Sequence, residues 1–449
     1  MTDTIYALAS GHGRAGIAVM RLSGPGAFDA LASLTPGKPA PTPRQAVLRR
    51  LIDPATSHAL DDALVLAFEG PASFTGEDVV EFHLHGGRAI IDGLTTCLQQ
   101  QPSMRLAEPG EFTRRAFENN RLDLTEAEAV ADLINAETEA QRLQALEQLS
   151  GALKDLYHQW ADRLARALAH LEADIDFPDE DLPDGVAPAV LPDLKALISE
   201  LDTHLNDNRR GERLRDGVTI AILGAPNAGK SSLLNAIAAR DAAIVSDIAG
   251  TTRDVIEVHL DLGGYPVTLL DTAGLRESDD AIEAEGIRRA LARADQADLK
   301  LLLVDGTEIN PTLPILPKAL AAYADSPNTI VAINKADLAS DLPVALDNHP
   351  ALAISAKDGD GLDNVLKALE HEVRNALQKN SDGPSLTRAR HREALETARD
   401  SIARALDAGP PELMAEDTRL ALRALGRITG RVDVEDLLDI IFRDFCIGK

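Results

Sequence analysis

Short apolar runs separated by glycine and proline fill the first part of the chain. The runs GIAVMRL, DDALVLAF and DVVEFHLH alternate with the turn-rich stretches SGPG, EGPASFTG and AEPGEF. Brief apolar runs bounded by turn residues are typical of strands in a mixed architecture. The pattern predicts an α/β domain over residues 1–118.

A helical pattern replaces this one after residue 118. Thr125 and Glu128, three residues apart ahead of an apolar run, predict a capping box at a helix start. Apolar residues then recur at intervals of three and four, the spacing of one helix face. They are Val130, Leu133, Ile134, Leu153, Leu156, Trp160, Leu164, Leu168, Leu171 and Ile175. We predict long helices that end at FPDEDLPDG, within a helical region over residues 119–214.

Strand-like runs then alternate with helical segments over residues 215–377. The runs are VTIAIL, VIEVHL, VTLLDT, LKLLLVD, NTIVAIN and ALAIS. This alternation predicts a parallel sheet with helices on both faces. Helical spacing returns over residues 378–449. The sequence therefore predicts a multi-domain α/β and all-α protein, in which the second α/β domain is inserted into a helical domain.

The charge balance restricts the partners of the chain. Lys and Arg number 45 against 72 Asp and Glu, which gives a net charge of −27 over 449 residues. Such a surface opposes non-specific binding to nucleic acid or anionic lipid. We expect any polynucleotide to be contacted locally or through another protein.

Cysteine content and hydropathy favour the cytoplasm. The chain has two cysteines, Cys97 and Cys446, which is too few for a disulfide framework. No basic segment followed by an apolar one opens the sequence, and no apolar run approaches the roughly 20 residues of a membrane span. We expect a soluble cytoplasmic protein.

A phosphate-binding loop follows the strand VTIAIL. The stretch GAPNAGKSS fits G-x-x-x-x-G-K-[ST] with Gly224, Gly229, Lys230 and Ser231. Glycines let the backbone N–H groups curl around phosphates, the lysine reaches the terminal phosphates, and the serine hydroxyl can hold Mg²⁺. A glycine-rich turn without this function is the weaker alternative.

Three further motifs indicate a guanine nucleotide. Asp271–Gly274 ends one strand, where its carboxylate can reach Mg²⁺ through water, and either Thr251 or Thr252 can close over the metal. Asn334–Asp337 ends another strand, and its final carboxylate can accept from two N–H donors that guanine presents and adenine does not. Ser355–Lys357 completes the base pocket. Buried acceptors left unpaired cost about 1–3 kcal/mol, so the ligand is predicted to be GTP.

The residues available for GTP hydrolysis differ from those of Ras-like GTPases. Leu275 replaces the glutamine that orients the attacking water, and no arginine finger can be assigned. Asn227 can help to hold a monovalent cation against the phosphates, or it can simply stabilise the loop. The water-holding acid remains open among Glu277, Asp279, Asp280, Glu283 and Glu285.

Several stretches together resemble one family over essentially the whole chain. They are GAPNAGKSSLLN, DIAGTTRD, DTAGLRE, FTGEDVVEFHLHGG, PGEFTRRAF, RLDLTEAEAVADLI, IDFPDED and the terminal FCIGK. These stretches identify the chain as similar to the MnmE (TrmE) tRNA-modification GTPases.

The resemblance implies both a function and partners. It implies a potassium-activated GTPase that forms a homodimer and binds 5-formyltetrahydrofolate or a related folate in its N-terminal domain. With the flavoprotein MnmG (GidA), in a heterotetramer, the family installs a carboxymethylaminomethyl-type group at C5 of the wobble uridine of certain tRNAs. The G domains of the family dimerise when GTP and potassium are bound, and hydrolysis is coupled to the modification.

The resemblance also implies ligand residues. Potassium falls on Asn227, Ser246, Ile248 and Thr251, and Mg²⁺ falls on Ser231 and Thr252. The catalytic acid that orients water falls on Glu283. The folate set is Arg21, Glu81, Arg121 and Lys449, with Arg121 where the family has lysine. A guanidinium can still pair with folate carboxylates, so binding is expected to persist.

GTP contacts are expected along all of these motifs. The residues are Asn227, Ala228, Gly229, Lys230, Ser231, Ser232, Ser246, Asp247, Ile248, Ala249, Gly250, Thr251, Thr252, Asp271, Thr272, Ala273, Gly274, Asn334, Lys335, Ala336, Asp337, Ser355, Ala356 and Lys357.

The terminal FCIGK is expected to fold back against the N-terminal domain. This would bring Cys446 and Lys449 beside the folate, where the resemblance makes Cys446 catalytic in the modification. Its role as nucleophile, proton donor or spacer stays open, as does burial as a small apolar residue. Cys97 is expected to pack in a core. His83 and His85 have the spacing of a metal-binding pair but no evident third ligand.

A second class of function remains. The chain can instead be a GTP-driven dimerisation switch that assembles RNA machinery, for example in ribosome maturation, without base chemistry. The FCIGK and TGED segments favour the enzyme, and so does the lack of a basic C-terminal RNA-binding module.

Overall fold

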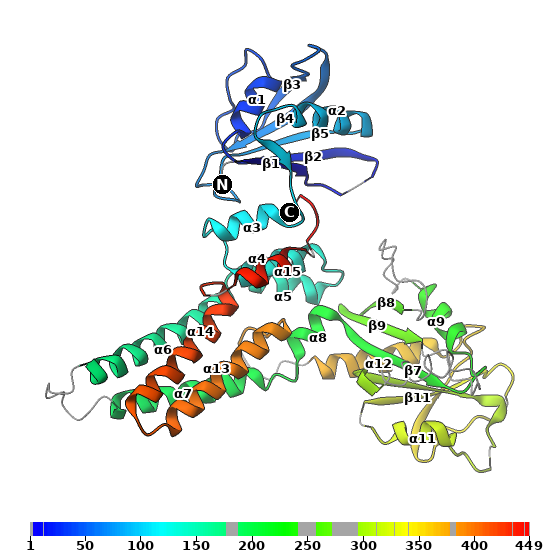
Figure 1. Cartoon of the computed structure of the whole chain (residues 1–449). Coiled ribbons are helices and arrows are strands. Elements are labelled where there is room, and N and C mark those ends of the chain that lie inside the picture. The colour runs from blue at the N-terminus through cyan, green and yellow to red at the C-terminus, as the bar shows by residue number, and fades with distance from the viewer. Residues whose placement is uncertain are drawn as a thin grey trace, which may run out of the picture. The chain divides into compact units, whose positions relative to one another are not determined.

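The computed structural model describes residues 3–11, 13–176, 187–240, 257–271, 295–310, 312–326, 328–339, 341–377, 383–432, 434–443 and 445–448 (Figure 1). The chain forms two compact units. The first comprises Met1–Ala131, Gln148–Asp193 and Asp400–Lys449, and the second comprises Asp132–Glu147 and Leu194–Arg399. Both units are thus assembled from segments that are distant in sequence.

A six-stranded sheet forms the core of the first unit, in the order β3-β4-β5-β2-β1-β6. Its strands are β1 (Thr4–Leu8), β2 (Ala15–Ser23), β3 (Val47–Ile52), β4 (Ala59–Phe68), β5 (Val79–Gly86) and β6 (Met104–Leu106). All neighbouring pairs are antiparallel except β1 and β6, which are parallel. The apolar runs of the sequence are these strands, so the predicted α/β architecture is confirmed.

Alternation along the strands gives this sheet one fully covered face. On β5, Val80, Phe82 and Leu84 enter a buried cluster with α1 (Ala27–Leu34) and α2 (Arg88–Gln99). On the other face, Ile5, Ala7 and Ala107 pack with Phe112 of α3 (Glu111–Glu118). Helix α3 therefore joins the sheet to the helical part of the unit.

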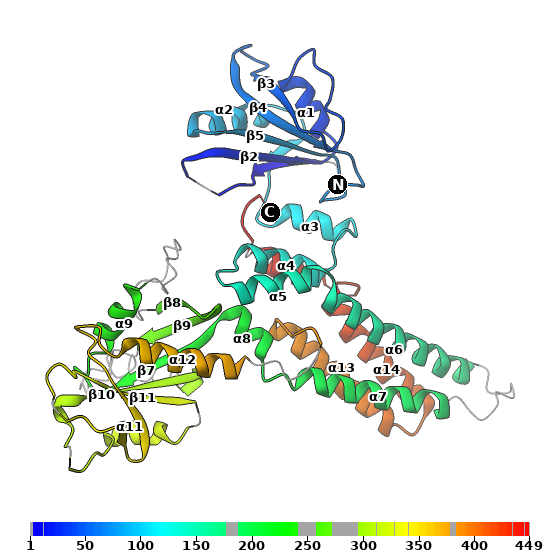
Figure 2. The ribbon, with the colours of Figure 1, turned by 180° about the vertical axis from the view of Figure 1, so that it is seen from behind.

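The remaining helices carry the periodicity seen in the sequence. They are α4 (Leu124–Ile134), α5 (Glu139–Leu149), α6 (Ala152–Asp176), α7 (Ala187–Leu205), α13 (Ala389–Asp407), α14 (Pro411–Thr429) and α15 (Glu435–Arg443). Trp160, Leu164 and Leu168 of α6 are buried, as are Leu425 and Ile428 of α14, the helix beside it (Figure 2). Residues 177–186, which hold the FPDEDLPDG segment, lie outside the described part.

The capping box predicted from Thr125 and Glu128 is wrong by two residues. The reciprocal pair is Asp123 and Glu126: the Glu126 N–H donates to Asp123 Oδ1, and the Asp123 N–H donates to Glu126 Oε2, both at 2.8 Å. An N-cap must precede the first helical residue, and α4 begins at Leu124. Burial raises the pKa of Asp123 despite hydrogen bonds from Glu126 and Thr125 that act to lower it.

A seven-stranded sheet forms the core of the second unit, in the order β12-β13-β11-β10-β7-β9-β8. The strands are β7 (Val218–Gly224), β8 (Glu257–Leu262), β9 (Tyr265–Asp271), β10 (Leu299–Asp305), β11 (Thr329–Asn334), β12 (Ala345–Leu346) and β13 (His349–Ala353). The five from β13 to β9 in this order are mutually parallel, and β8 and β12 add antiparallel edges. The predicted parallel sheet is confirmed for these five strands, whereas the described residues of the run VIEVHL lie in the antiparallel edge strand β8.

Helices cover both faces of this sheet. Ile220 and Ile222 of β7 pack with α9 (Lys230–Ala238) and α12 (Leu362–Ala376), whereas Ala221 and Leu223 face α11 (Lys318–Ala324) on the other side (Figure 1). The 3-10 helix η1 (Gly306–Glu308) follows β10. Burial on both faces explains why these strands read as continuous apolar runs rather than alternating ones.

Arginines fasten the segments through which the chain enters and leaves this sheet. Arg210 of α8 (Arg210–Asp216) donates to the Leu377 carbonyl at 2.8 Å. Arg392 of α13 donates to the Leu205 carbonyl at 2.7 Å and to Asp207 at 2.6 Å. These bonds tie together backbone segments that lie more than a hundred residues apart in sequence.

No helix within the described ranges is long and apolar enough to cross a membrane.

Gly211→Ala tests how closely α8 packs against the segment through which the chain leaves the seven-stranded sheet. A Cβ at Gly211 would lie 1.9 Å from the Leu386 oxygen, whereas one at Gly383 would meet nothing within 4 Å. We expect Gly211→Ala to lower the free energy of unfolding by about 1–3 kcal/mol through overpacking, and Gly383→Ala to leave it nearly unchanged. Urea unfolding of the two variants measures this, and equal midpoints would contradict the close approach.

Candidate functional site

The GTP motifs meet at one edge of the seven-stranded sheet. Registers place Gly224 of β7 opposite Leu303 of β10, and Asp271 of β9 opposite Ile222 of β7. Carboxyl ends of parallel strands lie at the same edge, where ligands bind in open α/β sheets. The structure therefore brings together motifs that are spread over more than a hundred residues of sequence.

Backbone conformation curls the phosphate loop. Asn227 has φ of 67° and Gly229 has φ of 95°, in the left-handed region. A Cβ at Gly229 would lie 2.2 Å from Asn334 Nδ2, and one at Gly224 would lie 2.5 Å from the Leu303 oxygen. Both glycines are required because backbone or side-chain atoms occupy the space that a side chain would need.

Lys230 supplies positive charge to the loop. It is 7% exposed and opens α9, and its ammonium donates to the carbonyls of Gly224 at 2.8 Å and Ala225 at 3.1 Å. Ser231 and Ser232 follow in the first turn and are exposed. A cation beside the N–H groups of a helix N-terminus is suited to phosphate.

Asn334 connects the loop to the base-binding motifs. Its side chain is 3% exposed, donates to the Ala228 carbonyl at 2.8 Å and accepts from the Ala356 N–H at 2.9 Å. Ser355 donates to Asp337 Oδ1 at 2.9 Å, which fixes the carboxylate predicted to read guanine. Three of the motifs thus form one hydrogen-bonded unit.

Asp305 belongs to this unit, and the sequence reasoning missed it. Its carboxylate accepts from Lys335 and, at 2.7 Å, from the Thr307 hydroxyl. Burial raises the pKa of Asp305, but hydrogen bonds from Lys335 and Thr307 outweigh it, so the pKa stays below its usual value. An acid ending the strand LKLLLVD, the parallel neighbour of NTIVAIN, was the available signal.

Several predicted residues lie outside the described part. They are Ser246, Asp247, Ile248, Ala249, Gly250, Thr251, Thr252, Thr272, Ala273, Gly274, Glu283 and Lys449. Among the residues that are described, no group of three or more His, Cys, Asp or Glu is arranged to hold a metal ion. The exposed Asn227 side chain and the Ser231 hydroxyl, both oxygen ligands, fit cations held mainly by a nucleotide.

A second cluster surrounds two of the predicted folate residues in the first unit. Arg21 Nε donates to Glu81 Oε1 at 2.9 Å across β2 and β5. The Arg21 guanidinium lies 5.9 Å from the Phe74 ring centre and 5.7 Å from that of Phe112. An ion pair beside aromatic rings on a partly open face can recognise a flat polar heterocycle or a carboxylate.

Arg121 lies beside the loop that carries Phe74. A Cβ at Gly76 would lie 3.3 Å from Arg121 Cγ. The loop of residues 73–78 therefore lies next to both Arg21 and Arg121.

The C-terminal tail folds back onto the first unit, as predicted. Ile447 forms a bridge with Pro109, and the Gly110 N–H donates to the Cys446 carbonyl at 3.4 Å. A Cβ at Gly448 would lie 2.2 Å from the Leu8 oxygen. Cys446 itself is exposed, so its reading as a buried apolar residue is wrong.

The other singled-out residues have structural partners. Cys97 is buried in the α2 core, as predicted. His83 lies 3.4 Å from Glu81, and His85 contacts Asp61 at 2.8 Å, so each imidazole pairs with a carboxylate.

A phosphate loop at the end of one parallel strand, bonded through Asn334 to a guanine-type pocket, defines a P-loop GTPase. The comparisons specify which one. The profile "GTP-binding protein TrmE N-terminus" matches residues 4–121, and "MnmE helical domain" matches residues 124–446. The chain belongs to the MnmE (TrmE) family and is a GTPase.

Relatives match over all of this chain and over most or all of their own length. The "tRNA modification GTPase MnmE" of Parvibaculum lavamentivorans is 57% identical, and that of Paramagnetospirillum magneticum is 55% identical, each over 100% of both chains. A mitochondrial protein of Danio rerio, "5-taurinomethyluridine-[tRNA] synthase subunit GTPB3", is 47% identical over 100% of this chain and 93% of its own.

One solved structure is Aquifex aeolicus Era bound to GDP·AlF₄⁻. It is 25% identical, covers 41% of this chain and 66% of its own, and has a TM-score of 0.28, too low for a structural conclusion.

Asp337→Asn tests guanine recognition. An amide presents a donor to the guanine N–H groups, so we expect GTP affinity to fall at least about tenfold and xanthosine triphosphate, which has a carbonyl at that position, to bind better. Nucleotide titration measures this. Asp341→Asn, at an exposed carboxylate of the same unit, serves as control. Unchanged GTP preference in Asp337→Asn would contradict the assignment.

Thiol labelling tests the two cysteine environments. Burial, together with the Asp53 charge, raises the pKa of Cys97 to about 11, whereas Cys446 is exposed. At pH 8 Cys97 is a neutral, buried thiol. A disulfide reagent should therefore label only Cys446 in the folded protein, and both cysteines in urea. Fast labelling of Cys446→Ser would show that the Cys97 core opens.

Proposed function

We propose that the chain is a potassium-activated GTPase that modifies the wobble uridine of certain tRNAs together with the flavoprotein MnmG (GidA). The group installed is of the carboxymethylaminomethyl type at C5. The names of the full-length relatives support tRNA modification. The observation that carries the GTPase part is the bonded unit of Lys230, Asn334 and Asp337 at one sheet edge.

Nucleotide binding uses side chains already oriented. Lys230 exchanges the Gly224 and Ala225 carbonyls for terminal phosphates, and Asp337, held by Ser355, accepts from guanine. Mg²⁺ is assigned to Ser231 and Thr252, and potassium to Asn227, Ser246, Ile248 and Thr251. These cations supply positive charge where an arginine finger acts in other GTPases. The positive φ and the exposed side chain of Asn227, within the phosphate loop, support this role.

Hydrolysis needs a group that orients water, because Leu275 cannot. Glu283 is assigned this role as a general base or water holder. Positioning a water for in-line attack, rather than covalent catalysis, is what this class of enzyme requires of the protein.

The first unit is proposed to bind 5-formyltetrahydrofolate or a related folate. Arg21, Glu81, Arg121 and Lys449 form the assigned site, and the ion pair between Arg21 and Glu81 supports the part of it that the structure describes. Cys446, exposed in this tail, is assigned to the modification reaction. The donor carbon and the GTP site thus belong to different units of the chain.

A homodimer is also proposed. Leu48, Leu64, His83 and Val19 are register partners across four strands and share the face opposite the α1–α2 core. Leu48 is 69% and Leu64 is 40% exposed. Exposed leucines on a sheet face support a surface that another subunit covers. The flavoprotein partner is proposed to supply much of the tRNA contact in a heterotetramer, since the net charge of −27 opposes RNA binding.

The domains assigned are 1–118 for folate binding and dimerisation, 119–214 and 378–449 for the helical domain, and 215–377 for the G domain. A cytoplasmic location is proposed, which the small number of cysteines supports.

GTP turnover in potassium against sodium buffer at matched ionic strength tests the proposal. We expect at least tenfold faster turnover in potassium, lost in Asn227→Ala and kept in Asn375→Ala, a control at an exposed position of α12. The reason is that a cation beside the phosphates stabilises transition-state charge. Equal rates in both salts would favour the dimerisation switch without base chemistry.

A further inference from the structure

We propose that Arg115 is a positioning residue for the folate site. It holds the loop of residues 73–78 so that Phe74 lies against Arg21 and Gly76 lies against Arg121. The proposal rests on the folate function proposed above.

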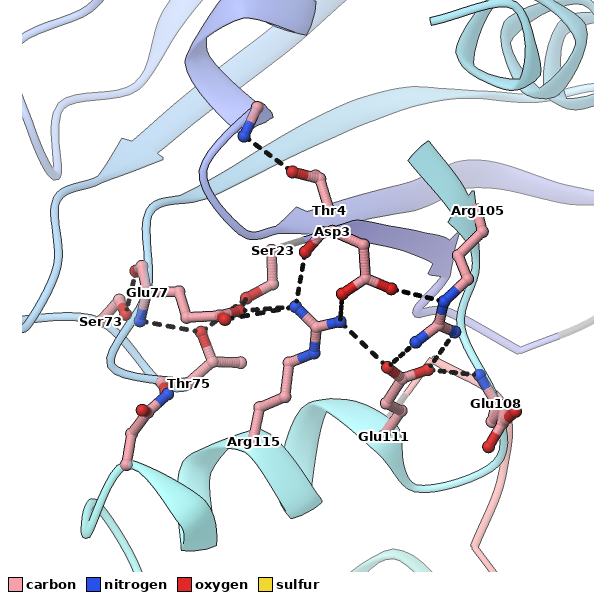
Figure 3. Close-up of polar contacts among 12 residues, drawn as sticks. Asp3, Thr4, Ser23, Ser73, Thr75, Glu77, Arg105, Glu108, Glu111 and Arg115 are labelled. Atoms are coloured by element: carbon pink, nitrogen blue, oxygen red, sulfur yellow. Dashed lines mark hydrogen bonds and ion pairs between the residues drawn. The ribbon is translucent and has the colours of Figure 1, made fainter. Parts of the chain in front are cut away.

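Arg115 is buried completely and is the centre of an ion-pair cluster. Its side chain is 0% exposed, and it donates to the Asp3 carbonyl and Oδ1 at 3.1 Å each, to Glu111 at 3.0 Å and to Glu77 at 3.0 and 3.2 Å (Figure 3). A guanidinium removed from water must have several acceptors in fixed positions. Glu77 is the acceptor that belongs to the loop.

Hydrogen bonds made by Glu77 hold the rest of the loop in place. Its carboxylate also accepts from the Ser23 hydroxyl at 2.7 Å, and Ser23 bonds to Thr75 at 2.7 Å. The Glu77 carbonyl accepts from the Ser73 hydroxyl at 2.5 Å, and the Glu77 N–H donates to Thr75 at 3.3 Å. In Figure 3 the Glu77 side chain reaches from the loop to Arg115, which rises from α3.

The loop of residues 73–78 also lies against residues assigned to folate binding. Phe74 is 40% exposed, with its ring 5.9 Å from the Arg21 guanidinium. Phe112, on the other side of Arg21, is on α3 together with Arg115. Helix α3 thus supplies one ring directly and fixes the other through Glu77.

Loss of Arg115 removes the cation that compensates Glu77, whose side chain is 15% exposed. The loop then gains conformational freedom, and a ligand must order it on binding, which lowers affinity without removing any ligand contact.

Arg105 is a matched control within the same cluster. It donates to Asp3 at 2.6 Å and to Glu111 at 2.6 and 2.8 Å, the two acids that Arg115 also uses. The hydrogen bonds of Arg105 that the described residues show go to these acids and to the Leu106 carbonyl, none to residues 73–78. Arg105→Met therefore disturbs the cluster but keeps the link to the loop.

Calorimetric titration of the full-length protein with 5-formyltetrahydrofolate tests the proposal. We expect Arg115→Met to bind at least tenfold more weakly and Arg105→Met to bind within about threefold of the wild type, with GTP affinity unchanged in both. Phe74→Ala should also bind more weakly, and the Arg115→Met/Phe74→Ala double variant should lose clearly less than the sum of the two single losses, because placing Phe74 is part of what Arg115 does.

The outcomes separate the inference from the folate function. A wild type that does not bind the folate would overturn both. A wild type that binds, with Arg115→Met binding equally or with additive losses in the double variant, would overturn the inference alone. If Arg115→Met does not fold, Glu77→Gln, which keeps the size but removes the charge of the loop acceptor, should weaken binding in the same non-additive way, and unchanged affinity there would overturn the inference too.

Discussion

A guanidinium that leaves water must be surrounded by acceptors, and this constraint shapes both units. The two terminal nitrogens of Arg115 bind acids from the N-terminus, from α3 and from the loop before β5. Arg392 satisfies the constraint with the Leu205 carbonyl, Asp207 and Glu212. Because a guanidinium presents its donors in a fixed plane, each arginine sets the relative positions of segments that are remote in sequence. Asp3, Glu77, Glu111, Asp207 and Glu212 thus have a structural use around these two arginines.

The edge of the seven-stranded sheet that carries the GTP motifs also depends on hydrogen bonds between buried polar groups. Parallel pairing brings the strand ends together, but it does not fix the loops that follow them. The Asn334 side-chain amide holds them together, because it donates to the Ala228 carbonyl of the phosphate loop and accepts from the Ala356 N–H of the base pocket. A ligand therefore meets a loop and a base pocket that are already joined, and less of the binding free energy is used to order them.

Much of this was predictable from the sequence, and the failures have a common cause. Strands such as VTIAIL and the phosphate loop were predicted correctly because local pattern and tertiary context agree there. The cap at Asp123, by contrast, was placed at Thr125, since two overlapping motifs compete in LDLTEAE. Asp305 and Arg115 were missed because their importance lies in partners from other segments, Lys335 and Glu77, which spacing in sequence does not reveal. The assignments outside the described residues, Glu283 among them, stay predictions.

The hydrogen bond from Arg210 to the Leu377 carbonyl has an evolutionary implication. It holds the points where the chain enters and leaves the seven-stranded sheet within contact of each other, so the whole intervening fold closes as a loop whose ends are already adjacent. The entropy of closing a long loop grows only slowly with its length. A segment with the same end-to-end spacing can therefore be exchanged or enlarged at this point without separating Arg210 from Leu377.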